Sequence, residues 1–225
     1  MVGFVIAMQS EALPLLSIVK ESKQYVLAGR DCYEGELSGE KIAVIVCGIG
    51  KVNAASATQA LILRYQPDII INIGVAGAVN PDLKVCDVCA VSKAVQYDFD
   101  ITAIDDVPVG YIQNIKQQYI YTDKKIFERL SEKYKAVTVA SADRFSFKKS
   151  EAEFIKTLGG DLRDMELGAI AQVCFLNNVP YISLKTVSDT AGGSPTQEFI
   201  INLDKSTACV KEYIGGVMSV LKEFI

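Results

Sequence analysis

The amino-acid sequence predicts a three-layer α/β fold, in which helices cover both faces of a central sheet that is mixed but mostly parallel. Two patterns lead to this prediction. Short apolar runs rich in Ile and Val recur along the chain, and several are apolar at every position, as in strands buried on both faces. Segments with helical periodicity separate these runs, and such alternation is typical of α/β proteins.

The apolar runs expected to be strands are residues 2–7, 42–47, 68–73, 88–94, 137–141 and 180–186. The segments expected to be helices are residues 51–65, 123–134, 167–177 and 206–224. The first of these is alanine-rich, the second carries alternating charges, the third is mostly apolar and the last is amphipathic. Residues 105–118 show no clear pattern, and a long loop of this kind is often functional.

Length and charge restrict the class of protein. The chain has 225 residues, half of them apolar and without an internal repeat or linker, so we expect one domain over residues 1–225. A net charge of −4 and an isoelectric point near 5.0 argue against a nucleic-acid partner. The longest apolar run, residues 69–79, contains Asn72 and is shorter than the ~18 residues of a membrane span. We therefore expect a cytoplasmic protein without a membrane partner.

The chain contains no histidine. This excludes catalytic triads that use histidine, histidine-ligated zinc and imidazole proton transfer. Cys86 and Cys89 form a lone CxxC pair, which without a second pair or a histidine is a poor zinc site, and we interpret both as buried residues of a strand. We expect no metal and no cofactor. Carboxylates, lysine, tyrosine or thiols must then move any protons.

Glycine-bearing turns follow three of the predicted strands, at residues 47–51, 72–78 and 191–193. The first matches neither the P-loop nor the dinucleotide-binding motif. The second lies at the carboxyl end of a buried strand, where ligands bind in open α/β sheets. A tight turn that binds no ligand explains such a segment equally well.

Acidic residues occur where strands give way to helices or loops: Glu11, Asp164, Glu166 and Asp189. Each taken alone is compatible with a favourable interaction with a helix dipole. Glu11, Glu166 and Asp189 together could converge on one edge of a parallel sheet, where carboxylates suit a reaction with a cationic transition state. Phe145 also follows a strand and could stack on a planar ligand, although a core aromatic is the commoner outcome.

The motifs together resemble the methylthioadenosine/adenosylhomocysteine nucleosidases of the nucleoside phosphorylase superfamily, over essentially the whole chain. The similar segments, in order, are IAMQSEALPLL, CGIGKVNAA, PDIIINIGVAGAV, LKVCDVCAVSKAVQYDFDITA, SADRF, DMELGAIAQVC and VPYISLKTVSD. This resemblance implies a nucleoside phosphorylase-like fold and hydrolysis of the N-glycosidic bond of 5′-thio-substituted adenosines. It also implies a homodimer whose partner closes the 5′ side of each pocket.

The resemblance assigns roles to individual residues. Glu11 would activate water, and Asp189, beside Ser188, would protonate the adenine leaving group. The remaining implied contacts are to the ribose, from Met165 and Glu166; to adenine, from Phe145 and Ser146; and to the pocket wall or the 5′ end, from Gly77, Ile49 and Met8.

Departures from the family pattern keep two alternatives open. Val75 stands where the family has a serine, Lys185 where it has an arginine and Tyr97 where it has a histidine, while residues 104–110 lack the usual aromatics. A phosphorylase that uses phosphate instead of water is one alternative, although the chain has few arginines for phosphate capture. A catalytically weak nucleoside-binding protein is the other.

Overall fold

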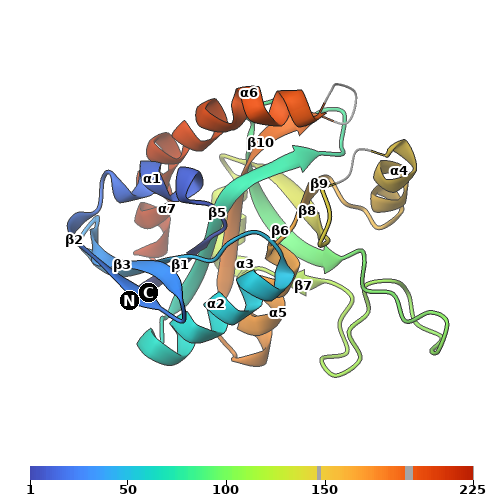
Figure 1. Ribbon diagram of the computed structural model, residues 1–225, viewed down its shortest axis with the longest axis horizontal. Helices are drawn as coiled ribbons and strands as arrows, with labels where there is room; N and C mark the ends of the chain where they lie inside the picture. The colour runs from blue at the N-terminus through green and yellow to red at the C-terminus, as the bar shows by residue number, and fades with distance from the viewer. Residues whose placement is uncertain (146–147, 191–194, 225) are drawn as a thin grey trace.

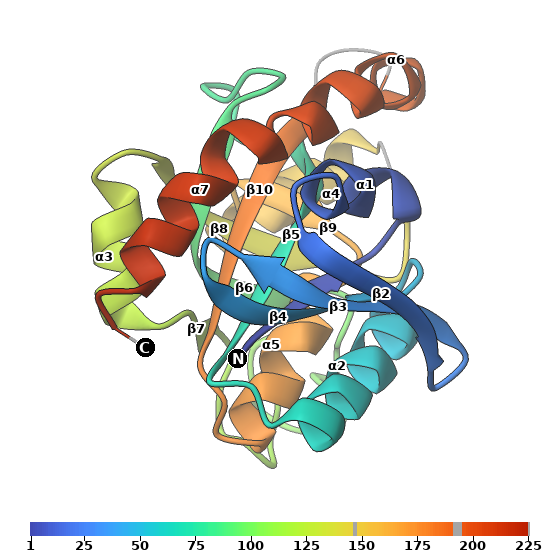
Figure 2. The same ribbon diagram turned by 90° about the vertical axis from the view of Figure 1, so that its left-hand side faces the viewer.

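The computed structural model describes residues 1–145, 148–190 and 195–224. The described residues form a mixed sheet of ten strands with helices on both faces, which confirms the predicted fold class (Figures 1 and 2). The strands are β1 (Val2–Ile6), β2 (Lys20–Leu27), β3 (Arg30–Leu37), β4 (Glu40–Val46), β5 (Ile69–Ala78), β6 (Val88–Gln96), β7 (Ile120–Tyr121), β8 (Lys135–Ser141), β9 (Leu162–Asp164) and β10 (Tyr181–Thr190). The helices are α1 (Gln9–Leu16), α2 (Lys51–Tyr65), α3 (Lys124–Ser131), α4 (Lys149–Thr157), α5 (Leu167–Leu176), α6 (Pro195–Ala208) and α7 (Val210–Leu221).

The predicted strands are all present, as β1, β4, β5, β6, β8 and β10. They pair mostly in parallel: β1 with β4 and β5, β5 with β10, and β6 with β8, whereas β6 and β10 are antiparallel. The antiparallel strands β2 and β3 lack a continuous apolar run because β2 is largely exposed, so the apolar-run criterion does not detect them. The helix expected over residues 206–224 is instead the end of α6 followed by α7, which meet at Cys209.

The central strand β5 explains why its sequence is apolar at successive positions. Ile70 contacts the hydrophobic core beneath α2 and α5, whereas Ile69 and Ile71 contact the core beneath α1, α3 and α7. Figures 1 and 2 show α2 and α5 on one face of the sheet and α1, α6 and α7 on the other. Both faces of the strand are therefore covered, as its composition requires.

Strand pairing closes part of the sheet on itself. β5 pairs with both β9 and β10, β10 pairs with β6, β6 with β8, and β8 with β9. This ring of five strands brings the end of β5 next to the ends of β9 and β10. Segments that are far apart in the sequence thus share one edge of the sheet.

The structure also tests the expectations for the loop at residues 105–118 and for the CxxC cysteines. Residues 105–118 contain only an isolated bridge between Ile112 and Gln117, as expected for a loop. Cys89 is buried in β6, but Cys86 lies before the strand with a φ of 71°, so our interpretation of Cys86 as a strand residue was wrong. Within the described part of the chain, no helix is long and apolar enough to cross a membrane.

Two leucines of α2 provide a matched test of the core. Leu61 is fully buried and Leu63 is 71% exposed. We expect Leu61→Ala to lower the free energy of unfolding by about 2–5 kcal/mol, because it removes buried methyl groups and leaves a cavity. Leu63→Ala is expected to change it by less than about 0.5 kcal/mol. Urea unfolding of both variants measures the difference, and equal losses would contradict the assignment of this helix face.

Candidate active site

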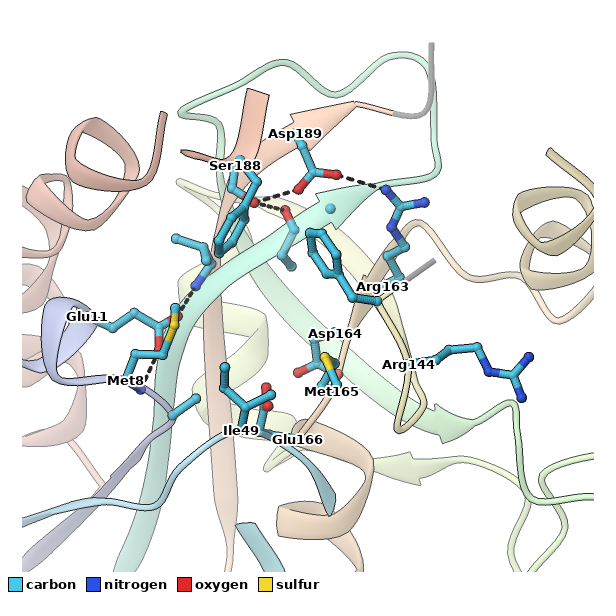
Figure 3. Close-up of a pocket in the computed structure, with 16 residues that line it drawn as sticks. Met8, Glu11, Ile49, Arg144, Arg163, Asp164, Met165, Glu166, Ser188 and Asp189 are labelled. Atoms are coloured by element: carbon cyan, nitrogen blue, oxygen red, sulfur yellow. Dashed lines mark hydrogen bonds and ion pairs between the residues drawn. The ribbon is translucent and has the colours of Figure 1, made fainter. Parts of the chain in front are cut away.

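A cavity of about 390 Å³ opens at the edge of the sheet where the carboxyl ends of β1, β5 and β10 lie near the short antiparallel strand β9 (Figure 3). In α/β proteins this edge is where ligands bind. Its lining residues are Ala7, Met8, Glu11, Ile49, Val75, Ala76, Gly77, Arg144, Phe145, Arg163, Asp164, Met165, Glu166, Ser188, Asp189 and Phe199. Every site residue proposed from the sequence is among them except Ser146, which lies outside the described residues.

Glu11 enters the cavity from the first turn of α1. Its two carboxylate oxygens accept backbone N–H groups, one from Met8 at 2.9 Å and one from Val75 at 2.8 Å. Gly74 permits this approach, because a Cβ atom there would lie 2.7 Å from Glu11 Oε1. Burial raises the pKa of Glu11, and the two backbone hydrogen bonds act in the opposite direction. The carboxylate is therefore held rigidly, and each oxygen keeps lone-pair capacity toward the cavity.

The valine at position 75, in place of the family's serine, does not affect the hydrogen bond to Glu11. Val75 holds Glu11 through its backbone N–H, and a backbone donor is independent of the side chain. Tyr97, which stands where the family has a histidine, is buried and donates to Glu151 of α4 at 2.7 Å. Tyr97 is not among the residues that line the cavity.

A buried cation lies beneath the cavity floor. Lys185 of β10 is 2% exposed, and its Nζ atom lies 2.8 Å from Asp164 Oδ2. Burial alone would lower the pKa of Lys185, but the charges of Asp164 and Glu166 outweigh it and the pKa is raised. Asp164 also accepts from Ser141 Oγ and from the backbone N–H of Leu167 at the start of α5. Lys185 is thus a buried ammonium that pairs with Asp164 and is also stabilised by the charge of Glu166.

Glu166 lies close to the ion pair of Lys185 and Asp164, and it lines the cavity. Its Oε1 atom accepts the backbone N–H of Gly50 at 2.9 Å, which ties the turn before α2 to the start of α5. Burial, with a smaller contribution from the charge of Asp164, raises the pKa of Glu166 to about 7. The carboxyl group therefore changes its protonation in the neutral pH range.

Asp189 lies at the opposite end of the cavity, beyond a β-bulge at Ser188 in the pairing of β10 with β5. Ser188 Oγ donates to Asp189 Oδ1 at 2.7 Å, and Arg163 Nη2 donates to Asp189 Oδ2 at 2.8 Å. Within this ion pair the Asp189 side chain is buried, at 2% exposure, and the Arg163 side chain is partly buried, at 10%. Figure 3 shows these two contacts on either side of the Asp189 carboxylate.

Two aromatic rings also line the cavity. Phe145 follows β8 and is 50% exposed, so it is not a core aromatic. Its ring lies edge to face with Phe199 of α6, with centroids 5.3 Å apart. Phe199, Arg144 and Arg163 were not proposed as site residues, because neither helical periodicity nor the glycine turns mark them.

The family model of the phosphorylase superfamily matches residues 1–217. The chain belongs to the phosphorylase superfamily. It is 33% identical over 207 residues to the 5′-methylthioadenosine/S-adenosylhomocysteine nucleosidase of Staphylococcus carnosus, covering 88% of this chain and 90% of that relative. The corresponding Anoxybacillus flavithermus protein is 29% identical over 227 residues, covering 96% and 97%.

Solved structures of the superfamily agree with this fold. A futalosine hydrolase of Helicobacter pylori has a TM-score of 0.90 at 27% identity, covering 99% of this chain and 97% of that chain. The nucleosidase of Neisseria meningitidis, solved with methylthio-immucillin-A, has a TM-score of 0.88 at 27% identity, covering 96% and 97%. This phosphorylase-superfamily chain is a nucleoside N-glycosidase of the same general type.

The buried ion pair of Lys185 with Asp164 predicts how a substitution at Lys185 changes stability. We expect Lys185→Met to lower the free energy of unfolding by about 3–5 kcal/mol, since it leaves a buried carboxylate without its cation. Lys124→Met is the control: its Nζ atom lies 3.8 Å from Glu128 in an exposed pair, worth less than about 1 kcal/mol. Urea unfolding at neutral pH measures both, and a loss for Lys185→Met no larger than that of the control would contradict this role.

The raised pKa of Glu166 predicts how the free energy of unfolding depends on pH. Its pKa rises from an ordinary value of 4.5 in the unfolded chain to about 7 in the fold. Between these values the folded protein holds a proton that the unfolded chain has released, so the free energy of unfolding falls as the pH rises through this window. Glu166→Gln should make that fall less steep, whereas Glu153→Gln, on the exposed face of α4, should not. Unfolding curves at several pH values test this, and parallel profiles for Glu166→Gln and the parent protein would refute it.

Proposed function

We propose that this protein hydrolyses the N-glycosidic bond of 5′-methylthioadenosine, S-adenosylhomocysteine or a related 5′-substituted adenosine, releasing adenine and a thioribose. The observation that carries the proposal is that Glu11 and Asp189 line one cavity. Met165 and Glu166 line the same cavity. The names of the similar nucleosidases support the same substrate class.

The ribose end of the cavity suits a cationic transition state. Departure of the base leaves an oxocarbenium-like sugar, which anionic groups stabilise more than the ground state. Glu166, oriented by Gly50, accepts hydrogen bonds from the ribose hydroxyls. Glu11, fixed by Met8 and Val75, accepts a proton from the attacking water. The water oxygen then bonds to C1′ as the bond from C1′ to the base breaks.

The base end of the cavity suits leaving-group chemistry. Adenine leaves poorly unless it is protonated, and a positioned carboxylic acid supplies such a proton. Asp189 fills that role in our proposal, with Ser188 orienting one of its oxygens. Phe145, exposed at the cavity edge, stacks on the base. These roles require neither histidine nor metal.

Hydrolysis is favoured over phosphorolysis by the position of the basic groups. Among the described residues that line the cavity, the basic side chains are Arg144 and Arg163. Arg163 is bound to Asp189 at the base end, away from Glu11, whereas phosphate would have to attack from the side of Glu11. The carboxylates near the ribose would also repel phosphate.

We further propose that the protein acts as a homodimer in the cytoplasm. Ile49 at the cavity edge is 53% exposed, and Val52 at the start of α2 is 78% exposed, which favours cover by a second copy. All six cysteines are free thiols, a state maintained in a reducing compartment.

An adenine-release assay tests the proposed reaction. The protein is incubated with 5′-methylthioadenosine with and without phosphate, and free adenine is measured. We expect release in both conditions at equal rates. Release only with phosphate would establish the phosphorylase alternative, and no release from any 5′-substituted adenosine would favour the weak nucleoside-binding alternative.

The catalytic assignment predicts the effect of one amide substitution. We expect Asp189→Asn to lower kcat by about 10²–10⁴-fold, because the amide cannot donate the acidic proton, while binding of the nucleoside survives. Asp31→Asn, at an exposed aspartate of β3, should retain full activity. Steady-state rates and calorimetric binding measure the two effects, and an active Asp189→Asn variant would show that the acid has been misassigned.

A further inference from the structure

The helix α2 begins with a lysine, Lys51, and its first turn contains no acidic side chain. The positive end of a helix dipole favours acidic residues in this turn and disfavours cations. The preceding turn, residues 47–51, matches no phosphate-binding motif. The cation at the start of α2 therefore needs a local explanation.

Lys51 takes part in a closed set of polar contacts. Its Nζ atom donates to Asp98 Oδ1 at 2.5 Å, and the other oxygen of Asp98 accepts the backbone N–H of Asp143 at 2.9 Å. Asp143 Oδ1 in turn accepts the backbone N–H of Lys51 at 2.7 Å. The side chains of Lys51 and Asp98 are partly buried, at 16% and 14% exposure. These three contacts form the Lys51 ring, which consists of Lys51, Asp98 and Asp143.

The Lys51 ring joins three segments that are distant in the sequence: the start of α2 and the ends of β6 and β8. Two of these segments contribute to the cavity. Ile49, before α2, and Arg144 and Phe145, after β8, all line it. Among the described residues, the members of the ring are not part of the cavity lining. Any effect of the ring on the reaction must therefore pass through the residues that it holds.

Gly50 connects the ring to Glu166, because its backbone N–H donates to Glu166 Oε1 at 2.9 Å. The φ angle of Gly50 is 101°, and a Cβ atom there would lie 3.1 Å from Asp143 Oδ1. Lys51, the next residue, is bound through both its backbone N–H and its side chain. Glycine has more backbone freedom than any other residue, so the direction of the Gly50 N–H depends on this anchor.

We infer that Lys51, Asp98 and Asp143 are positioning residues that hold the Gly50 N–H against Glu166 and so orient this carboxylate toward the ribose. This inference rests on the hydrolase function proposed above and deepens it, because it names residues that act on the substrate only through others. Without the ring, Glu166 stays in the cavity but loses its fixed donor. A carboxylate that is not preorganised stabilises the charge of the transition state less well.

The pH dependence of the reaction reports this role. Burial raises the pKa of Glu166 to about 7, and the hydrogen bond from Gly50 acts in the opposite direction. Loss of that bond raises the pKa further, since a hydrogen bond to the charged form favours that form. The acidic limb of kcat/KM follows groups that must be ionised in the free enzyme, so it moves to higher pH. The other titratable groups that interact with Glu166 keep their places: Asp164, Lys185, Glu11 and Cys47.

Two substitutions of opposite charge distinguish positioning from a simple field effect. Lys51→Met removes a cation, whereas Asp98→Asn removes an anion. If only the field of these charges acted on Glu166, the two substitutions would shift the acidic limb in opposite directions. Positioning predicts that both shift it to higher pH by about one unit, because each breaks the ring. We also expect kcat for 5′-methylthioadenosine at pH 7 to fall by about tenfold to a hundredfold, with a smaller change in KM.

Matched variants and a second readout control for general loss of structure. Lys51→Arg, which keeps a charged donor, should stay closer to the parent profile than Lys51→Met. Lys135→Met breaks a different ion pair, in which Lys135 Nζ lies 2.6 Å from Asp87, and it should leave kcat and the acidic limb unchanged. Lys51→Gln replaces Lys51→Met if that variant does not fold.

Carbon NMR titration of the free protein, labelled at glutamate, measures the pKa of Glu166 without turnover. The signal of Glu166 is identified by its absence in Glu166→Gln. We expect this pKa to rise by about one unit in both Lys51→Met and Asp98→Asn.

The outcomes separate this inference from the function on which it rests. Cleavage by the parent protein, with unshifted acidic limbs in Lys51→Met and Asp98→Asn, would overturn the inference and leave the hydrolase function standing. Shifts in opposite directions would do the same. If the parent protein releases no adenine, the proposed function fails, and the NMR titration alone decides whether the Lys51 ring holds the carboxylate of Glu166.

Discussion

A single buried ammonium group, Lys185, allows carboxylates to gather at the centre of this protein. Asp164 binds it directly at 2.8 Å, and the charges of Glu166 and Glu11 also act on it. Several buried carboxylates close together repel each other and lose hydration. Without a cation among them, this mutual repulsion and loss of hydration would oppose their position at the cavity. The carboxylates at this end of the cavity therefore depend on Lys185, which is not itself among the residues that line the cavity.

The two ends of the cavity place carboxylates in different environments. Glu11 is bound by backbone N–H groups from Met8 and Val75, whereas Asp189 is bound by the side chains of Ser188 and Arg163. Groups of one chemical type can take different roles when their surroundings differ. In the reaction that we propose, the general base and the general acid can thus both be carboxyl groups, in a chain that has no histidine.

Sheet closure is the geometric condition for this arrangement. Because β5 pairs with β9 on one side and β10 on the other, Gly77 lies between Arg163 and Asp189. Gly74, three residues earlier on the same strand, leaves room for Glu11. The two glycines let side chains from neighbouring segments occupy space that a side chain of β5 would otherwise fill.

Local patterns in the sequence were sufficient for the main strands, for the fold class and for the acidic residues at strand ends. Strands buried on both faces, such as β5, must be apolar at successive positions. They can therefore be recognised in the sequence without knowing which segments pack against them. The largely exposed strand β2, the partly buried strand β3 and the three-residue strand β9 carry no such signal. The ion pairs between Lys185 and Asp164 and between Arg163 and Asp189 were decided by the tertiary structure alone. They join residues 21 to 26 positions apart through strand register and a β-bulge, and periodicity within one segment contains no information about either.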